Sequence, residues 1–248
     1  MDPMREGASK PSVRPRSRAR IPRAVAGSRA SVLLAVLPAV MACSDDTPTG
    51  PPAGIGVEVL VLNSTGQTLA RYDVRGNSIV PAGPSLDLGA GFDGDGLAVS
   101  GDLAASAVSS FGGSSLVLVD LLSGSVNRAL FPGPDAALVN PSRPSIDAGD
   151  SIWVAGRGSD AVYRLNPGAA EAVLIAGGVG AFVERVILDG SRLYAIDANL
   201  DDDGLTYAPR GPGRIVELDR DGAARGVIDL PATSPNPSDG VFADGRLI

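Results

Sequence analysis

The sequence predicts an all-β fold, and its composition and its apolar pattern both support this. The 248 residues include 32 glycines and 20 prolines, which interrupt helices and are frequent in the turns between short strands. Short apolar segments alternate with such turns, and no helical spacing of apolar residues is visible. Apolar residues make up 44% of the chain, which is enough to bury a core.

The first repeated unit is an apolar strand that ends in Asp or Asn, followed by a glycine-containing turn and a second strand. It occurs four times, and the strand-ending residues are Asn63, Asp120, Asn166 and Asp219. Asp and Asn side chains accept hydrogen bonds from the turn backbone, and glycine tolerates a positive φ. The spacing of about 50 residues therefore predicts a repeated structural unit.

The second repeated unit is a glycine turn followed by a short apolar strand, at Gly101, Gly149, Gly190 and Gly245. Together the two units give at least four short strands in each period. This pattern is typical of a β-propeller blade, so we predict a β-propeller with four-stranded antiparallel blades. The alternative is a β-sandwich or an immunoglobulin-like array, which lacks this repeated order of strands.

The repeats divide residues 57–248 into about four blade units. The chain opens in the second half of a blade (57–74), continues through three whole blades, and closes in the first half of another (239–248). The two halves could join as one composite blade of a four-bladed ring. We favour a ring that is truncated at the C-terminus, because the last strand, 246–248, is shorter than the usual five residues or so.

Residues 1–42 have the features of a secretory signal peptide. Eight of the 21 basic residues lie in 1–29, and a largely apolar run of 13 residues follows, from Ala30 to Ala42. A membrane-spanning helix needs about 20 apolar residues, whereas the apolar part of a signal peptide is shorter. The basic part is long for a signal, so translation could also begin downstream of Met1.

The segment Val40-Met41-Ala42-Cys43 resembles the lipobox of bacterial lipoproteins, and Cys43 is the only cysteine in the chain. The resemblance implies that diacylglycerol and fatty acids such as palmitate are attached to Cys43, which becomes the first mature residue. Ser44, rather than Asp, then implies sorting to the outer membrane. Residues 43–56 are expected to form a flexible tether. The alternatives are an ordinary signal peptide, or a buried apolar strand with a chance cysteine.

Charge and composition exclude several classes of function. Residues 43–248 contain 13 Arg, no Lys and 26 acidic residues, and this negative surface repels nucleic-acid phosphates. We therefore expect no nucleic-acid partner, a membrane contact through the lipid anchor, and an envelope protein or glycan as the possible partner. The absence of histidine excludes catalytic triads and zinc sites that depend on it.

Residues 116–130 carry the repeat in its clearest form (LVLVDLLSGSVNRAL). They resemble the YVTN/YncE-like propellers, and the repeats as a whole, about 57–248, also resemble the NHL-like propellers. The resemblance implies the propeller fold. Because one fold serves many functions, it does not by itself identify a ligand or a reaction.

An acidic loop in the third whole blade resembles the start of a calcium-binding loop. The pattern Asn199-x-Asp201-x-Asp203 places oxygen ligands at alternate positions and is followed by glycine. With Asp197 it gives four candidate calcium ligands, although Arg210 stands where an EF-hand has its bidentate glutamate. The alternative is a solvated acidic loop without a metal, and we expect no cofactor to be required.

Other candidate residues have structural interpretations as well. We expect Trp153, Tyr163 and Tyr194 to pack between blades, with a stacking platform for sugar or peptide as the alternative. The loop 156–160, with Arg157 and Asp160, lies where a propeller face could touch a ligand, or it is a plain turn. We interpret the acidic glycine segment 92–96 as a hairpin turn, with a cation site as the alternative.

The sequence favours a non-enzymatic, lipid-anchored, extracytoplasmic propeller that presents one face to a protein, glycan or small ligand. No arrangement of catalytic residues is visible. One alternative is a calcium-dependent lactonase or another hydrolase, because residues 162–169 and 215–223 resemble gluconolactonase-like propellers. That resemblance implies a bound metal, with Glu184 and Asn199 as candidate ligands. The other alternative is a structural component of the envelope or surface layer.

Overall fold

The computed structural model describes residues 33–37, 57–110, 113–201 and 207–248. Cys43, the expected tether and Asp203 lie outside these residues. Within the described ranges the chain forms antiparallel sheets and one short 3-10 helix, η1 (Ala136–Leu138). None of the described helices is long and apolar enough to cross a membrane.

Four sheets follow one another along the chain, and each strand pairs antiparallel with its neighbours. The first sheet contains β1 (Leu33–Leu37), β2 (Val57–Asn63), β3 (Thr68–Arg75), β4 (Ser78–Pro81) and β5 (Leu86–Asp87), and the second contains β6 (Gly94–Ser100), β7 (Leu103–Ser110), β8 (Gly113–Asp120) and β9 (Val126–Leu130). The third sheet contains β10 (Pro141–Ile146), β11 (Ile152–Gly156), β12 (Ala161–Leu165) and β13 (Val173–Ala176). The fourth sheet contains β14 (Val183–Asp189), β15 (Arg192–Asp197), β16 (Arg214–Asp219) and β17 (Ala224–Asp229). A two-stranded hairpin follows, β18 (Phe242–Ala243) and β19 (Arg246–Leu247).

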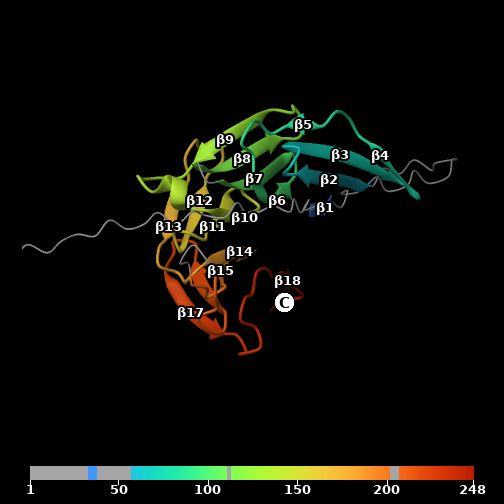
Figure 1. Cartoon of the computed structure of the whole chain (residues 1–248). Helices are drawn as coiled ribbons and strands as arrows, with labels where there is room; N and C mark the ends of the chain where they lie inside the picture. The colour runs from blue at the N-terminus through green and yellow to red at the C-terminus, as the bar shows by residue number, and fades with distance from the viewer. Residues whose placement is uncertain (1–32, 38–56, 111–112, 202–206) are drawn as a thin grey trace, which may run out of the picture.

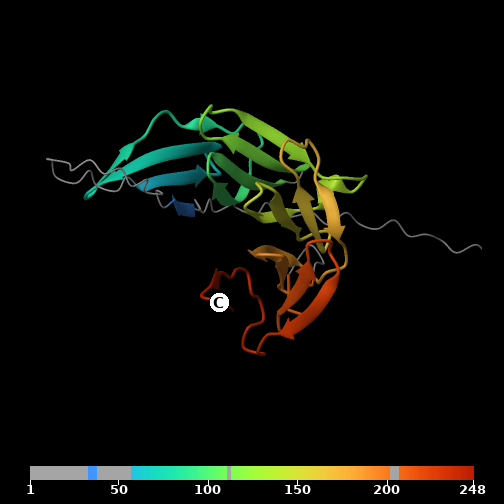
Figure 2. The same cartoon turned by 180° about the vertical axis from the view of Figure 1, so that it is seen from behind.

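The sheets are arranged along an arc, with β9, β13 and β17 on its convex side and β18 on its concave side (Figures 1 and 2). The first strands of successive sheets contact one another: β6 contacts β10, β10 contacts β14, and β14 contacts β18. This radial arrangement of four-stranded sheets is that of propeller blades. The three whole blades predicted from the repeats correspond to the second, third and fourth sheets.

The core lies between the sheets, and alternate residues of one strand belong to different core clusters. In β11, Ile152 and Val154 pack with the second sheet, whereas Trp153 and Ala155 pack with the fourth. Both faces of the strand are therefore covered, which explains why its sequence is continuously apolar rather than alternating. Trp153, Tyr163 and Tyr194 are buried, as expected, and Tyr194 stacks on Phe242 of the final hairpin.

The turns that follow β2, β8 and β16 confirm the predicted role of Asp and Asn. Asp120 Oδ1 accepts hydrogen bonds from the backbone amides of Leu122 and Ser123 at 2.9 and 2.8 Å. In the first sheet, Asn63 Oδ1 accepts one from the Gly66 amide at 2.7 Å. Gly124 has the expected positive φ of 72°, whereas in the first sheet the positive φ falls on Gln67 rather than on the glycine.

The hydrogen bonds to Asp219 in its turn predict that the stability of the protein depends on pH. The Ala223 amide, above all, lowers the pKa of Asp219; burial opposes the shift, and the Asp221 amide and Arg225 add to it. Because the carboxylate is favoured in the folded state, its stabilising contribution is present above about pH 4, the pKa of an unfolded Asp, and is lost as the pH falls through the lower folded value. We therefore expect the difference in urea midpoint between wild type and Asp219→Asn to shrink from pH 5 to pH 2.

Asparagine is the appropriate replacement because Asn63 accepts a hydrogen bond in the corresponding turn of the first sheet. The matched control is Asp221→Asn, which removes a neighbouring carboxylate that accepts no hydrogen bond within the described residues. A difference for Asp219→Asn that stays constant between pH 5 and pH 2 would contradict the prediction.

The first sheet includes a strand from within the expected leader. Strand β1 pairs antiparallel with β2, so that residue 33 is opposite Leu62 and residue 37 is opposite Glu58. Residues 57–74 form strands β2 and β3, which lie in the middle of this sheet, between β1 on one side and β4 and β5 on the other. Cleavage before Cys43 would separate β1 from β2, and the signal peptide stays a prediction.

The final hairpin lies where the first half of a blade was predicted. Within the described residues, β18 and β19 pair only with each other. The composite blade with β2 and β3, which a four-bladed ring would need, is therefore not formed in this structure.

Candidate functional site at the channel mouth

Charged side chains gather where the first strands of the blades begin, at the end of the sheets that holds the β11–β12 and β15–β16 connections. In a propeller these first strands line the central channel. We call the group the channel-mouth cluster. Its members are Asp95 on β6, Arg143 on β10, Arg157 just after β11, Glu184 and Arg185 on β14, and Asp239 before β18.

A break in strand register occurs at the same place in each of the three whole blades. The pairing with the second strand shifts between residues 95 and 98 in β6, between 142 and 145 in β10, and between 183 and 185 in β14. Such bulges change the direction in which a side chain points and are frequent beside functional sites. Asp95, Arg143 and Glu184 lie at or within these breaks.

Gly96 allows β6 and β10 to approach each other closely. Its φ is +81°, and a Cβ atom added there would lie 2.8 Å from the Cα of Arg143. Any larger residue would therefore push β10 away. The interpretation of residues 92–96 as a hairpin turn is wrong, because Gly94, Asp95 and Gly96 belong to β6, and Gly94 and Asp95 pair with β7.

Arg157 joins three blades through two ion pairs. Its guanidinium lies 2.5 Å from Asp95 Oδ2 of the second sheet and 2.8 Å from Glu184 Oε2 of the fourth. The side chains of Arg157 and Glu184 are only 15% and 10% exposed. Burial acts to lower the pKa of Arg157, but the charges of Asp95 and Glu184 outweigh it and raise the pKa. Arg157 therefore stays charged and holds the second and fourth sheets together through largely buried ion pairs.

Arg143 and Arg185 converge on Asp239 from two neighbouring blades. Arg143 Nη1 lies 3.1 Å from Asp239 Oδ2 and donates to the Ser238 carbonyl oxygen at 3.0 Å. Arg185 Nη1 contacts the other carboxylate oxygen of Asp239. The Asp239 side chain is 47% exposed, so this part of the cluster faces solvent.

The candidate calcium ligands that the structure describes already have partners. Asp197 is fully buried, and its carboxylate accepts hydrogen bonds from the Ala181 and Asn199 amides and from Arg214. Asp201 pairs with Arg210 at 2.8 Å. Guanidinium groups therefore neutralise the two described carboxylates, and these residues do not fit a bound cation as they stand.

Among the described residues, no group of three acidic, cysteine or histidine side chains could hold a metal. Asp203 lies outside those residues, so the calcium loop stays a prediction. The two residues implied by the lactonase resemblance are also engaged elsewhere, Glu184 by Arg157 and the Asn199 amide by the Pro212 carbonyl oxygen. In the described part of the chain they share no hydrogen bond with each other.

Both charged residues of the loop 156–160 contact the fourth sheet or its approach. Arg157 pairs with Glu184, and Asp160 Oδ1 accepts a hydrogen bond from the Phe182 amide at 2.7 Å. The loop is thus more than a plain turn. Sequence reasoning missed Arg143, Arg185 and Asp239, although a charged residue inside a predicted strand was an available signal for the first two.

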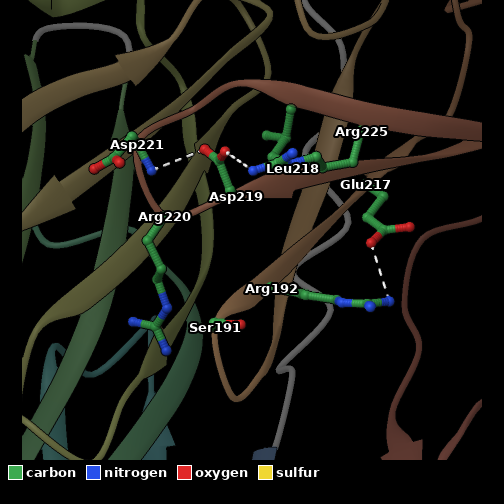
Figure 3. Close-up of a pocket in the computed structure, with 8 residues that line it drawn as sticks. All are labelled: Ser191, Arg192, Glu217, Leu218, Asp219, Arg220, Asp221 and Arg225. Carbon is green, nitrogen blue, oxygen red and sulfur yellow. Dashed lines mark hydrogen bonds and ion pairs between the residues drawn. The ribbon is translucent and has the colours of Figure 1, made fainter.

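A second polar site lies at the opposite end of the fourth sheet. A pocket of about 510 Å³ opens between the β14–β15 and β16–β17 turns (Figure 3), and it is lined by Ser191, Arg192, Glu217, Leu218, Asp219, Arg220, Asp221 and Arg225. Its three arginines each pair with a carboxylate: Arg192 with Glu217, Arg225 with Asp219, and Arg220 with Asp147 of the third sheet. These pairings favour a role in joining turns and blades.

Comparisons with known proteins identify the fold. No protein-family model and no curated protein sequence matches the chain. Solved β-propeller structures do match it. Hydrazine synthase of Kuenenia stuttgartiensis is 18% identical with a TM-score of 0.53, over 70% of this chain and 46% of that one.

Two other solved structures show the same likeness. Virginiamycin B lyase of Staphylococcus aureus, an inactive variant with quinupristin, is 12% identical with a TM-score of 0.54, over 77% of this chain and 58% of that one. A chain of the nidogen/laminin complex is 15% identical with a TM-score of 0.55, over 79% and 72%. The chain thus spans about half the length of the first two structures. Its fold is a β-propeller with four-stranded antiparallel blades.

Proposed function

We propose that this protein is a lipid-anchored, extracytoplasmic binding module whose propeller presents the channel mouth to a polypeptide ligand. The main observation is the channel-mouth cluster, in which three successive first strands carry charged side chains at matching bulges. Strands hold such side chains more precisely than loops do, as a recognition site requires. The comparisons support a binding role in general, because one similar propeller comes from a complex between two proteins.

Binding is favoured over the chemistry of the similar lyase. The inactive variant of that lyase replaces a histidine by alanine, and the 248 residues of this chain contain no histidine. The charged side chains of the channel mouth are arranged in ion pairs, which suits recognition of a polar partner.

The proposed anchor rests on the segment that ends at Cys43. A basic start, a short apolar run and a small residue before a single cysteine together resemble a lipoprotein signal. Acyl chains would then attach the protein to the outer membrane without help from its acidic surface. This location places the channel mouth where it can meet envelope polypeptides.

The anchor is tested by Cys43→Ser in cells of the source organism. We expect the wild-type protein in the membrane fraction with an intact mass that includes acyl chains, and the variant without them in the soluble fraction. Ser44→Ala is the matched control, since it changes the adjacent residue and leaves the thiol. Equal mass and fractionation for wild type and Cys43→Ser would remove the lipoprotein proposal.

The binding role is tested by a photo-cross-linking residue in place of Asn236, an exposed position three residues before Asp239. We expect a defined polypeptide adduct in intact cells, and its loss when Arg185→Gln is added. The matched control places the same residue at Asp221, at the opposite end of the fourth sheet. Equal adducts at both positions, or none at Asn236, would argue against a ligand at the channel mouth.

A further inference from the structure

Two arginines contact the carboxylate of Asp239 in the way that a binding site contacts the carboxylate of a ligand. We propose that Arg143 and Arg185 bind the carboxylate of an acidic peptide ligand, and that Asp239 occupies this receptor as an internal competitor. The inference rests on the proposed function and specifies the ligand of the same site. Residues 143 and 239 are 96 positions apart, so the folded blades alone create this arrangement.

The receptor side is held by the sheets. Arg143 and Arg185 stand on the first strands of neighbouring blades, and each follows a buried residue, Ser142 and Glu184. The Ser142 hydroxyl donates to the Glu184 carbonyl oxygen, which joins the two strands directly beside the arginines. The points at which the two arginine side chains leave the backbone therefore stay near each other whether or not a carboxylate lies between the guanidinium groups.

Asp239 is held less firmly than Arg143 and Arg185 are. Asp239 lies in the connection 230–241, which contains no strand, and its side chain is 47% exposed. Backbone hydrogen bonds that involve Gly213 hold this connection at Leu230 and Ser234. Release of the Asp239 carboxylate would leave those contacts intact, so the segment can yield the receptor without unfolding.

Removal of Asp239 leaves an excess of positive charge at the channel mouth. The cluster then has three arginines against two carboxylates, and Asp95 and Glu184 are both engaged by Arg157. Arg143 Nε is 3.9 Å from Asp95, and the described residues offer Arg185 no other acidic partner. The Nε atom of Arg185 is buried and has no hydrogen-bond partner in this part of the chain. A half-buried guanidinium pair of this kind favours a carboxylate.

The second contact of Arg143 favours a peptide over a simple organic acid. Its Nη1 binds the carbonyl oxygen of Ser238, the residue immediately before Asp239, at 3.0 Å. The receptor therefore recognises a side-chain carboxylate together with the preceding main-chain carbonyl. An acidic residue inside a polypeptide supplies both groups at this spacing, whereas acetate supplies only the first.

The experiment measures binding of a fluorescent peptide with the sequence of residues 234–240 and blocked ends. We expect Asp239→Asn to bind it about tenfold more tightly than wild type, because an internal carboxylate at millimolar effective concentration no longer competes. The same peptide with Asn in place of its Asp should not bind. Adding Arg143→Gln or Arg185→Gln to Asp239→Asn should abolish binding of the acidic peptide.

The matched control is Asp244→Asn, which removes a carboxylate from the β18–β19 turn that has no partner in the described residues. Asn also accepts the positive φ of 50° at this position. Asp244→Asn should bind the peptide as weakly as wild type, and thermal unfolding monitored by circular dichroism checks that each variant is folded. Asp239→Ser serves as a second variant without the carboxylate.

Three results would overturn the proposal: no gain in affinity for either Asp239 variant, equal binding of the Asp and Asn peptides, or competition by acetate as strong as that by unlabelled peptide. The two proposals can fail separately. A cross-link from position 236 without peptide binding would reject the acidic ligand and keep the binding module. Peptide binding in vitro without a cellular adduct would keep the carboxylate-binding arginines and reject a polypeptide ligand at the channel mouth in the cell.

Discussion

Replacing Trp153 with alanine is expected to lower the free energy of unfolding by about 3–5 kcal/mol, the usual cost of removing a large buried aromatic side chain. Trp153 is 1% exposed and packs against residues of the fourth sheet. The guanidinium carbons of Arg164 and Arg220 lie 5.4 and 5.1 Å from its ring centroid. Its Nε1 donates to Asp147 Oδ2 at 3.0 Å, so alanine would remove packing, cation–π contacts and a hydrogen bond together.

Trp153→Phe separates packing from polar contacts. It keeps most of the buried ring but removes the N–H group, while Asp147 keeps its ion pair with Arg220. We expect a loss of about 1.5–3 kcal/mol for this change, since the lost hydrogen bond ends on a charged group. Trp153 is the only tryptophan, so urea unfolding should be followed by circular dichroism rather than fluorescence.

The control for both variants is Leu122→Ala, because that side chain is 83% exposed. It should change the free energy of unfolding by less than about 0.5 kcal/mol. A loss below about 1 kcal/mol for Trp153→Ala would contradict the prediction. It would mean that the measured unfolding transition does not break the contact between the third and fourth sheets.

Most of the fold could be predicted because its signals are local. The turn after a blade's third strand needs a side-chain acceptor and a residue with positive φ, and Asp120 with Gly124 supplies both within five positions. Continuous apolar strands such as β11 follow equally directly, because neighbouring blades cover both of their faces. A repeat of such local signals is sufficient to place the three whole blades.

The channel mouth could not be predicted, because its contacts depend on how distant blades meet. Arg143 and Asp239 share no local pattern, and they come together only when the third blade, the fourth blade and the final connection are in place. The bulge in β6 hid Asp95 as well, since Gly94 and Gly96 favour a turn locally while the sheet holds them in a strand. Strand β1 shows the same ambiguity, because a short apolar run suits either a leader or a strand.

Replacing Arg157 with methionine is expected to destabilise the protein by about 3–5 kcal/mol, because breaking a buried ion pair leaves an uncompensated charge. Glu184, which is 10% exposed, would lose the guanidinium that pairs with it, and Asp95, which is 25% exposed, would keep only the longer contact of 3.9 Å with Arg143 Nε. The expected result is a lower urea midpoint at pH 7. The double variant Arg157→Met with Glu184→Gln should recover part of the loss, since it removes the more buried of the two unpaired charges.

Arg185→Gln is the informative comparison, because Arg185 also bears an ion pair in the same cluster. Its side chain and that of Asp239 are 29% and 47% exposed, so solvent screens the pair, and the expected cost is about 0–1 kcal/mol. If the two variants differ in this way, Arg157 is part of a rigid frame and Arg185 is available for exchange between internal and external carboxylates. A loss for Arg185→Gln as large as that for Arg157→Met would make Asp239 a structural partner and would remove the physical basis of the peptide receptor.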